Sequence, residues 1–402
     1  MVNINSRNFM HELSENISRV PDMAHLSYRE DEWSLLESAI TEKNPRLALT
    51  LIDQGIPINR ANSLGKTPLM LACDNELTEV ALKLMDKGVD IHAKDTNGNT
   101  ALMCASRHPT CHEVAIRLLD EGVDVDDQNA SGYTALLISC MSLVHSDPTP
   151  LPMKLIEADA TINKKTMSGR YPLIEACRSG LPSVAMKLID EGANTAAIDY
   201  CGFTALICAC QRNLTDVALR LINEGVVVNE QDCWKCTALI HACRRGLDDV
   251  AMKLIDAGAL LDLQDSDKQT ALIHAIIAKR TTVAIQLIAE GTDIDTISKS
   301  GNTPLMYACA AGCTTIALRL IEEDVALDGQ NKKGQTALML ACRNGLTDVV
   351  KELLAKGADI NIKDKNGAAA CHYAFESPAL ARALGSRSRI IHHTFTVWGS
   401  NC

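Results

Sequence analysis

A short motif returns along this chain at a nearly constant spacing, and this repetition constrains the fold more than any other feature. The copies begin at Thr67, Thr100, Thr134, Tyr171, Thr204, Thr237, Thr270, Thr303, Thr336 and Ala369. Seven of the nine intervals between these anchors are 33 residues long, and the other two are 34 and 37 residues. A fixed period of this length is typical of proteins built by stacking one small unit, so we expect a repeat architecture.

The residues inside one period predict a pair of antiparallel helices. In the unit that contains Thr237, apolar residues recur at helical spacing both before and after Gly246. Thr237 suits the cap of the first helix, and Gly258 suits a left-handed cap at the end of the second. A polar segment then follows, as in residues 94–99, and predicts a projecting turn. One such unit cannot bury its own apolar face, so neighbouring units must stack.

The motif itself resembles the ankyrin repeat. It reads TPLMLAC from Thr67, TALIHAC from Thr237 and TPLMYAC from Thr303, and the likeness extends over roughly residues 30 to 384. The resemblance implies an all-α solenoid of stacked antiparallel helix pairs with projecting β-turn fingers. The family's histidine after TPL is replaced by apolar residues such as Met70 and Ile240. We therefore expect the loss of a helix-capping hydrogen-bond network, with apolar packing in its place.

The pattern divides the chain into three parts. Residues 1–30 form a leader with apolar residues at helical spacing, which predicts a capping helix or, alternatively, an amphipathic helix that binds a partner. Residues 31–384 form the array, with degenerate first and last units and a longer unit at 134–170. Three prolines at 147–152 predict a protruding loop between the two helices of that unit. Residues 385–402 form a tail that we expect to be disordered or to carry a short interaction motif.

Composition excludes several classes of function. The net charge of -11 disfavours binding to nucleic acid, and no apolar run is long enough to span a membrane. Seven of the sixteen cysteines fall at one position of a helix, where they serve as packing residues of a protein in a reducing compartment. We therefore expect a cytoplasmic or nuclear location. Long ankyrin arrays are abundant in large DNA viruses and intracellular bacteria, and that resemblance would place the chain in a host cytoplasm.

No familiar catalytic signature is present, because the sequence contains no phosphate-binding glycine loop, no GxSxG elbow and no HExxH pair. We expect neither an enzyme nor a cofactor. Cys233 and Cys236 form a CxxC near Cys201, but a structural zinc site normally needs a second pair, so we predict reduced thiols and no metal. His241 and His274 share one helical position and are expected to be packing or partly exposed residues.

Aromatic and basic residues gather in the middle repeats and suggest a partner-binding surface. Tyr133, Tyr200, Phe203 and Trp234 lie in turn segments, where burial in a core does not explain them, and exposed aromatics are typical of binding hot spots. Arginines end the first helices at Arg178, Arg212, Arg244 and Arg245. They indicate either a contact zone for an acidic protein segment or a solvated face with internal ion pairs.

These features together predict a non-enzymatic, monomeric module that binds another protein on its concave or finger surface. A structural spacer without a dominant partner, or a thiol- or metal-binding protein, is the alternative.

Overall fold

The computed structural model describes residues 32–141, 150–374, 380 and 384. Contacts divide the chain into a first unit, residues 1–144 with 150–161, and a second unit, residues 145–149 with 162–402. These described ranges contain twenty α-helices and no β-strand, so the expected all-α class is confirmed. None of the described helices combines the length and the apolar character needed to cross a bilayer. The leader at 1–30 and the tail at 385–402 lie outside the described residues, so the predictions made for them stay predictions.

The first unit is a stack of helix pairs. Its pairs are α2 (Glu32–Thr41) with α3 (Pro45–Asp53), α4 (Pro68–Asp74) with α5 (Thr78–Asp86), α6 (Ala101–Ser106) with α7 (His112–Asp120), and α8 (Ala135–Met141) with α9 (Pro150–Glu157). A 3-10 turn, η1 (Pro109–Cys111), leads into α7. The expectation that the prolines at 147–152 all lie in a loop is wrong, because Pro150 and Pro152 belong to the first turn of α9. A first helical turn accepts proline, since its N–H groups have no partner within the helix.

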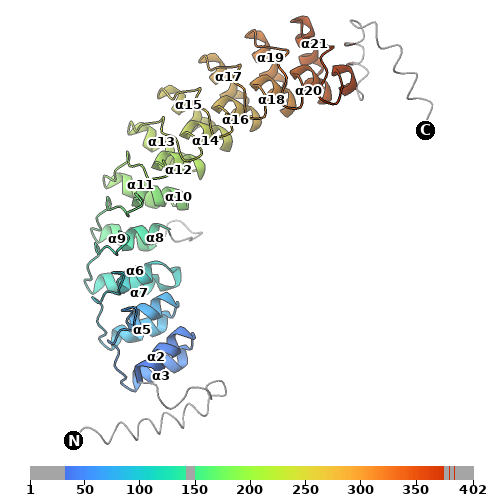
Figure 1. Ribbon diagram of the computed structural model, residues 1–402. Coiled ribbons are helices and arrows are strands. Elements are labelled where there is room, and N and C mark those ends of the chain that lie inside the picture. Colours follow the sequence, from blue (N-terminus) through green and yellow to red (C-terminus); the bar gives the residue numbers. More distant parts are fainter. Residues whose placement is uncertain (1–31, 142–149, 375–379, 381–383, 385–402) are drawn as a thin grey trace, which may run out of the picture. The chain divides into compact units, whose positions relative to one another are not determined.

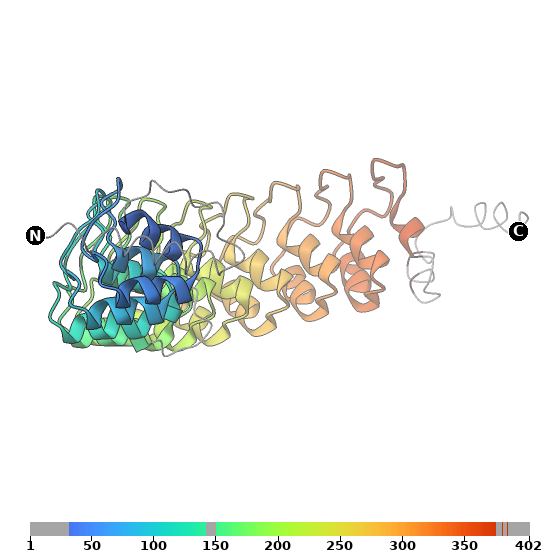
Figure 2. The ribbon, with the colours of Figure 1, turned by 90° about the horizontal axis from the view of Figure 1, so that it is seen from below.

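The second unit repeats the same pair, with first and second helices alternating along the chain (Figure 1). The turns between pairs all project from one side of these helices, as the yellow to red part of Figure 2 shows. The pairs are α10 (Pro172–Ser179) with α11 (Pro182–Asp190), α12 (Ala205–Gln211) with α13 (Thr215–Asn223), α14 (Ala238–Arg245) with α15 (Asp248–Asp256), α16 (Ala271–Ile277) with α17 (Thr281–Ala289), α18 (Pro304–Ala311) with α19 (Thr314–Glu322), and α20 (Ala337–Arg343) with α21 (Thr347–Ala355). A 3-10 turn, η2 (Ala370–Tyr373), packs on α20.

Threonine caps begin most of the first helices. The hydroxyl oxygen of Thr237 accepts a hydrogen bond from the N–H of Ile240, three residues ahead. The same bond from the residue three positions ahead is made to the threonines at 67, 100, 134, 204, 303 and 336. The predicted threonine cap is therefore confirmed, whereas these bonds do not test the loss expected from the missing histidine. Met70 and Ile240 fill the position of the family's histidine as buried side chains, so the apolar packing expected there is confirmed.

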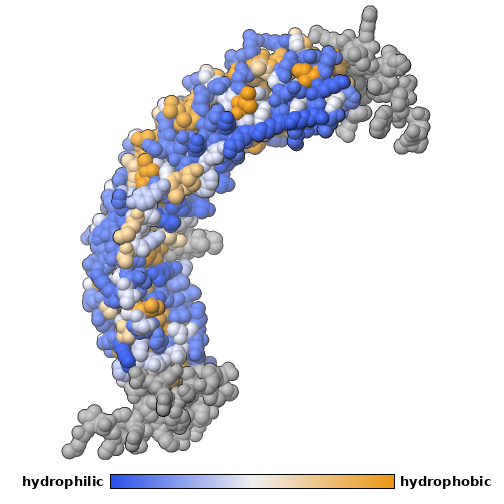
Figure 3. Space-filling model, in the orientation of Figure 1, coloured by the Kyte–Doolittle hydropathy of each residue, from blue (hydrophilic) through white to orange (hydrophobic). Residues whose placement is uncertain are grey.

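Small apolar residues fill the space between the helices. The cysteines of the repeated position (Cys73, Cys140, Cys177, Cys210, Cys243, Cys309 and Cys342) are all buried, as the sequence predicted. Burial raises the pKa of the Cys210 and Cys309 thiols to about 12, so these thiols stay protonated. The outer surface is mostly hydrophilic, with separate apolar patches (Figure 3).

Candidate partner-binding surface

Each projecting turn, here called a finger, is held by one side chain at its base. In the finger at 199–204, Oδ1 of Asp199 accepts hydrogen bonds from the N–H groups of Cys201 and Phe203, both at 2.9 Å. Asp232 and Asp265 hold the next two fingers with the same pair of bonds. Because the base fixes the backbone, the two residues that follow it form the tip of the finger and point into solvent.

Apolar tips stand on three consecutive fingers of the second unit. The exposed fractions are 73% for Met167, 76% for Tyr200 and 53% for Trp234. Tyr200 and Trp234 are thus exposed as the sequence predicted, whereas Met167 was missed, because a lone methionine in a polar turn carries no periodic signal. We call these three residues the apolar tips.

Lysines occupy the tips of the later fingers. Lys299, Lys332, Lys333 and Lys365 are exposed, and Lys299 has only the exposed Asp267 nearby, at 3.6 Å. Within the described part of the chain, the other three form no ion pair. We call these four residues the basic tips. The basic tips place positive charge on consecutive fingers of a protein whose net charge is -11.

Phe203 does not lie on this surface, and its predicted exposure is wrong. Its side chain is only 7% exposed. The Trp234 ring packs edge-on against it with centroids 5.7 Å apart, and the guanidinium of Arg178 lies 4.9 Å from its ring centre. Phe203 is the fourth residue after the base Asp199, where the backbone turns inward again. It supports Trp234 from beneath and orders that exposed ring.

Tyr133 belongs to the first unit, so the structure does not gather it with the other predicted residues. It is half-buried and lines a cavity of about 290 Å³ with Arg107, Asn129, Ile138 and Met141. The remaining seven predicted residues all lie in the second unit.

The four predicted arginines separate into two kinds. Arg178 and Arg244 occupy one helical position and turn toward the base of the next finger. Arg178 lies 2.6 Å from Asp199 and 2.5 Å from Glu175, and Arg244 lies 3.3 Å from Asp265. These two therefore form the internal ion pairs of the alternative interpretation, while Arg244 keeps 40% of its side chain exposed and the contact-zone interpretation stays a prediction. Burial raises the pKa of Glu175 against the opposing pull of Arg178.

Arg212 and Arg245 sit one residue further along their helices. Both are exposed, and neither forms an ion pair with any residue that the structure describes. They are the part of the predicted basic series that remains free to meet a partner.

Two buried aspartate–histidine pairs lie behind the fingers, and sequence reasoning missed them. Nε2 of His241 donates to Oδ2 of Asp232 at 2.9 Å, and His274 donates to Asp265 at the same distance. All four side chains are buried. Each histidine follows its aspartate by nine residues, and Tyr373 follows Asp364 at the same spacing with a 2.6 Å bond. That constant spacing is the signal that could have revealed them.

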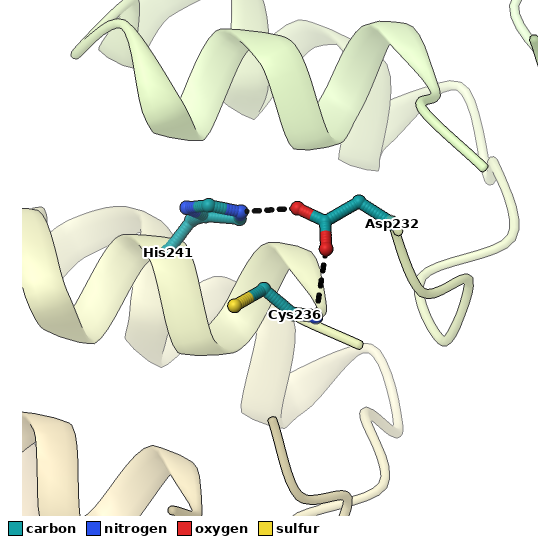
Figure 4. A group of neighbouring side chains, drawn as sticks. All are labelled: Asp232, Cys236 and His241. Atoms are coloured by element: carbon teal, nitrogen blue, oxygen red, sulfur yellow. Dashed lines mark hydrogen bonds and ion pairs between the residues drawn. The ribbon is translucent and has the colours of Figure 1, made fainter. Parts of the chain in front are cut away.

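Cys236 completes a buried group with Asp232 and His241 whose ligand atoms lie within 4.8 Å of one another (Figure 4). Metal binding fits this group poorly. Nη2 of Arg244 lies 3.3 Å from the sulfur, where a cation would be repelled, and burial raises the thiol pKa to about 11. The next repeat keeps the Asp–His pair with Gln269 in place of the cysteine. The pair is therefore structural, and the buried Cys236 does not share a setting with the exposed Cys201 and Cys233.

Stacked helix pairs with aspartate-held fingers define a helical repeat protein. A family profile described as ankyrin repeats (3 copies) matches residues 35–129, 81–148, 150–232, 214–298 and 281–364. The chain therefore belongs to the ankyrin-repeat family, a family whose repeats generally mediate protein–protein interaction.

Comparison with solved structures gives the human ASB11 ankyrin repeat domain as one similar chain. The two are 24% identical with a TM-score of 0.46, and the alignment covers 55% of this chain and 98% of the human domain. No match was found among curated protein sequences.

Proposed function

We propose that this chain is a non-enzymatic binding module that holds a segment of another protein along the fingers of its second unit. The observation that carries the proposal is the exposure of the three apolar tips on consecutive fingers. Each of these side chains keeps more than half of its surface in water, although the Trp234 ring packs on Phe203 and the Tyr200 ring lies against Gly169 of the preceding finger. Tyrosine and tryptophan are also the residues most often found at binding hot spots.

Trp234 is a suitable anchor because it is ordered before any partner arrives. Its ring rests on Phe203 at 5.7 Å, and Phe203 is itself fixed beneath Arg178. Ordering a free side chain on binding costs roughly 0.5–1.5 kcal/mol, and this arrangement avoids much of that cost.

The chemistry of the tips specifies the partner segment. Apolar side chains of the partner would meet the apolar tips, and acidic side chains would meet the basic tips on the later fingers of the same unit. Arg212 and Arg245, at the ends of α12 and α14, add exposed positive charge to the same unit. We propose a peptide-like segment with an apolar or aromatic part and an acidic part, bound by a chain that needs no cofactor.

A display library of random peptides, panned on the full chain, tests this directly. We expect enriched peptides to combine apolar or aromatic residues with aspartate or glutamate, and their affinity to fall as salt rises. The variant Tyr200→Ala with Trp234→Ala should lose them, and Lys332→Glu with Lys333→Glu should weaken them.

Matched controls separate the fingers from general surface effects. Val227→Ala with Leu260→Ala removes comparably exposed apolar side chains that are not at finger tips, and Lys253→Glu reverses an exposed charge on α15. Both controls should bind as the native chain does. If the finger variants also keep the peptides, or if no sequence is enriched, the finger surface is not the binding site and a spacer role becomes the better explanation.

A further inference from the structure

Backbone hydrogen bonds join neighbouring fingers at one repeated position. The N–H of the first tip residue donates to the carbonyl oxygen of the second tip residue on the preceding finger. In the second unit the pairs are Ser266 to Trp234 and Lys299 to Asp267 at 2.8 Å, and Lys332 to Ser300 and Lys365 to Lys333 at 3.0 Å. Residues in these two positions therefore lie in backbone contact across neighbouring fingers.

Cysteines occupy both of these positions at a single junction. Cys201 is the second tip residue of the finger at 199–204, and Cys233 is the first tip residue of the finger at 232–237. Both are exposed free thiols. The hydrogen bond between their backbones is not formed, although both residues lie in the described part of the chain. The row of bonds is thus interrupted at this junction, as it also is between Tyr200 and Ser168 at the preceding one.

The two fingers nevertheless touch. A Cβ atom placed on Gly202 would lie 3.2 Å from Cα of Asp232, and these two residues are the immediate chain neighbours of Cys201 and Cys233. The pKa of the Cys233 thiol is raised by burial, then by Asp232, and then by Cys201 itself. That last influence agrees with two thiols that lie near each other.

We propose that Cys201 and Cys233 form a reversible disulfide that cross-links the two fingers when the chain meets a low-molecular-weight disulfide such as glutathione disulfide. Backbone segments in hydrogen-bonding contact lie roughly 5 Å apart, and the chain neighbours of the two cysteines are in backbone contact. A disulfide requires a Cα separation of about 4.4–6.8 Å. The register of the fingers therefore places these two cysteines within disulfide range, and the missing hydrogen bond leaves the tips free to adjust.

The reaction is a pair of thiol–disulfide exchanges. One cysteine thiolate attacks a sulfur of glutathione disulfide, forms a mixed disulfide and releases one glutathione thiolate. The second cysteine thiolate attacks the protein sulfur of that mixed disulfide and releases the second glutathione. The protein loses two electrons and glutathione disulfide gains them, and the two thiol protons end on the two glutathione molecules.

Few other cysteines can compete for the oxidant. Burial raises the pKa of the Cys208 thiol to about 12 and that of Cys236 to about 11, and both lie out of solvent. Among the cysteines that the structure describes, Cys371 is the other exposed one, and it lies in η2 and not on a finger. Cys371 is therefore a matched control for simple exposure.

The bond would also affect the surface described above. Tyr200 precedes Cys201 and Trp234 follows Cys233, so the cross-link would fix the spacing of two apolar tips. This consequence rests on the proposed function, whereas the disulfide itself does not, and the test below measures the disulfide without any partner.

The experiment treats the reduced full chain with glutathione disulfide, blocks remaining thiols and maps the products by mass spectrometry after trypsin. Cleavage after Lys235 separates Cys233 from Cys236, whereas the peptide 188–212 holds Cys208 and Cys210 besides Cys201, so fragmentation of the linked peptides identifies the partner sulfur. We expect the linked pair Cys201–Cys233 in the native chain, with faster formation as pH rises because the pKa of Cys233 is raised.

The single variants supply the decisive comparison. Cys201→Ser and Cys233→Ser should each accumulate one stable glutathione on the remaining cysteine, because the second exchange is removed, whereas Cys371→Ser should form the linked pair as the native chain does. Circular dichroism of each variant checks that the helices are retained. Stable glutathione on both Cys201 and Cys233 of the native chain, or a disulfide-linked dimer in place of the internal bond, would overturn the proposal.

Discussion

Gly202 offers a direct measurement of how tightly the fingers pack. Its φ is +79°, and a Cβ added there would lie 2.3 Å from the carbonyl oxygen of Gln231 on the next finger. Gly225 ends α13 with a similar φ of +73°, but a Cβ there would meet nothing within 4 Å. Changing each glycine to alanine therefore imposes the same backbone penalty, and only Gly202→Ala adds a collision with backbone.

The expected losses follow from these two terms. A left-handed alanine costs roughly 1–2 kcal/mol, and the stiffer unfolded chain returns roughly 0.4–1 kcal/mol. Gly225→Ala should therefore lower the free energy of unfolding by about 1 kcal/mol. Overpacking adds roughly 1–3 kcal/mol at Gly202, so the total loss there should be about 2–4 kcal/mol.

Urea unfolding followed by circular dichroism measures both variants against the native chain. Gly202→Ala should have the lower midpoint with an unchanged slope. Equal midpoints for the two variants would refute the argument, because the fingers would then yield to an added methyl group at no cost.

Three further changes test other parts of the second unit. Lys235→Gly should raise the free energy of unfolding by up to about 1 kcal/mol, because a lysine at φ +59° bears the left-handed penalty that glycine does not. The urea midpoint should rise with it, and a lower midpoint would contradict this. Asp265→Asn should cost about 1–3 kcal/mol at pH 7. Burial raises the pKa of Asp265, but hydrogen bonds from His274 and two backbone N–H groups outweigh it and lower that pKa. This stability is present above the unfolded pKa of about 3.9 and disappears as pH falls through the folded value. Between pH 7 and pH 2, the free energy of unfolding should therefore fall less steeply in the variant than in the native chain. The same pH dependence in both would exclude this role of Asp265. Phe203→Ala should cost about 3–5 kcal/mol, whereas Trp234→Ala should cost under about 1 kcal/mol, and equal thermal shifts would show that Phe203 is not the buried support of that ring.

The periodic part of the structure was predictable because its signals are local. A threonine that caps a helix and a glycine that ends one act within a single turn, so the anchors of the repeat marked the helix starts correctly. Burial of the repeated cysteines followed from the same register. Pro150 shows the limit of such signals, because it was predicted to lie in a loop but begins α9. Proline breaks the interior of a helix but is accepted in its first turn.

The side chains of the candidate surface were harder to predict because their direction depends on the register within the turn. Phe203 lies four residues after its base aspartate, and Asn99 and Cys236 at the equivalent position are also buried. Arg178 and Arg244 each precede an aspartate by 21 residues and turn inward to meet it. Arg212, one position further along its helix, has a cysteine at that distance and remains in solvent. Comparing equivalent positions across repeats would have separated these cases, whereas counting residue types could not.

The same comparison explains why the finger tips carry information about binding. Asp199 and Asp265 hold their fingers with the same two hydrogen bonds, although one tip carries Tyr200 and the other carries Asp267. Because the same base bonds form under both tips, the backbone of the finger does not require an aromatic residue there, although the Tyr200 ring also lies against Gly169. A polar tip would satisfy the fold as well as Tyr200 does and would not expose an aromatic ring to water. The exposed part of that ring is the surface that the proposed partner would cover.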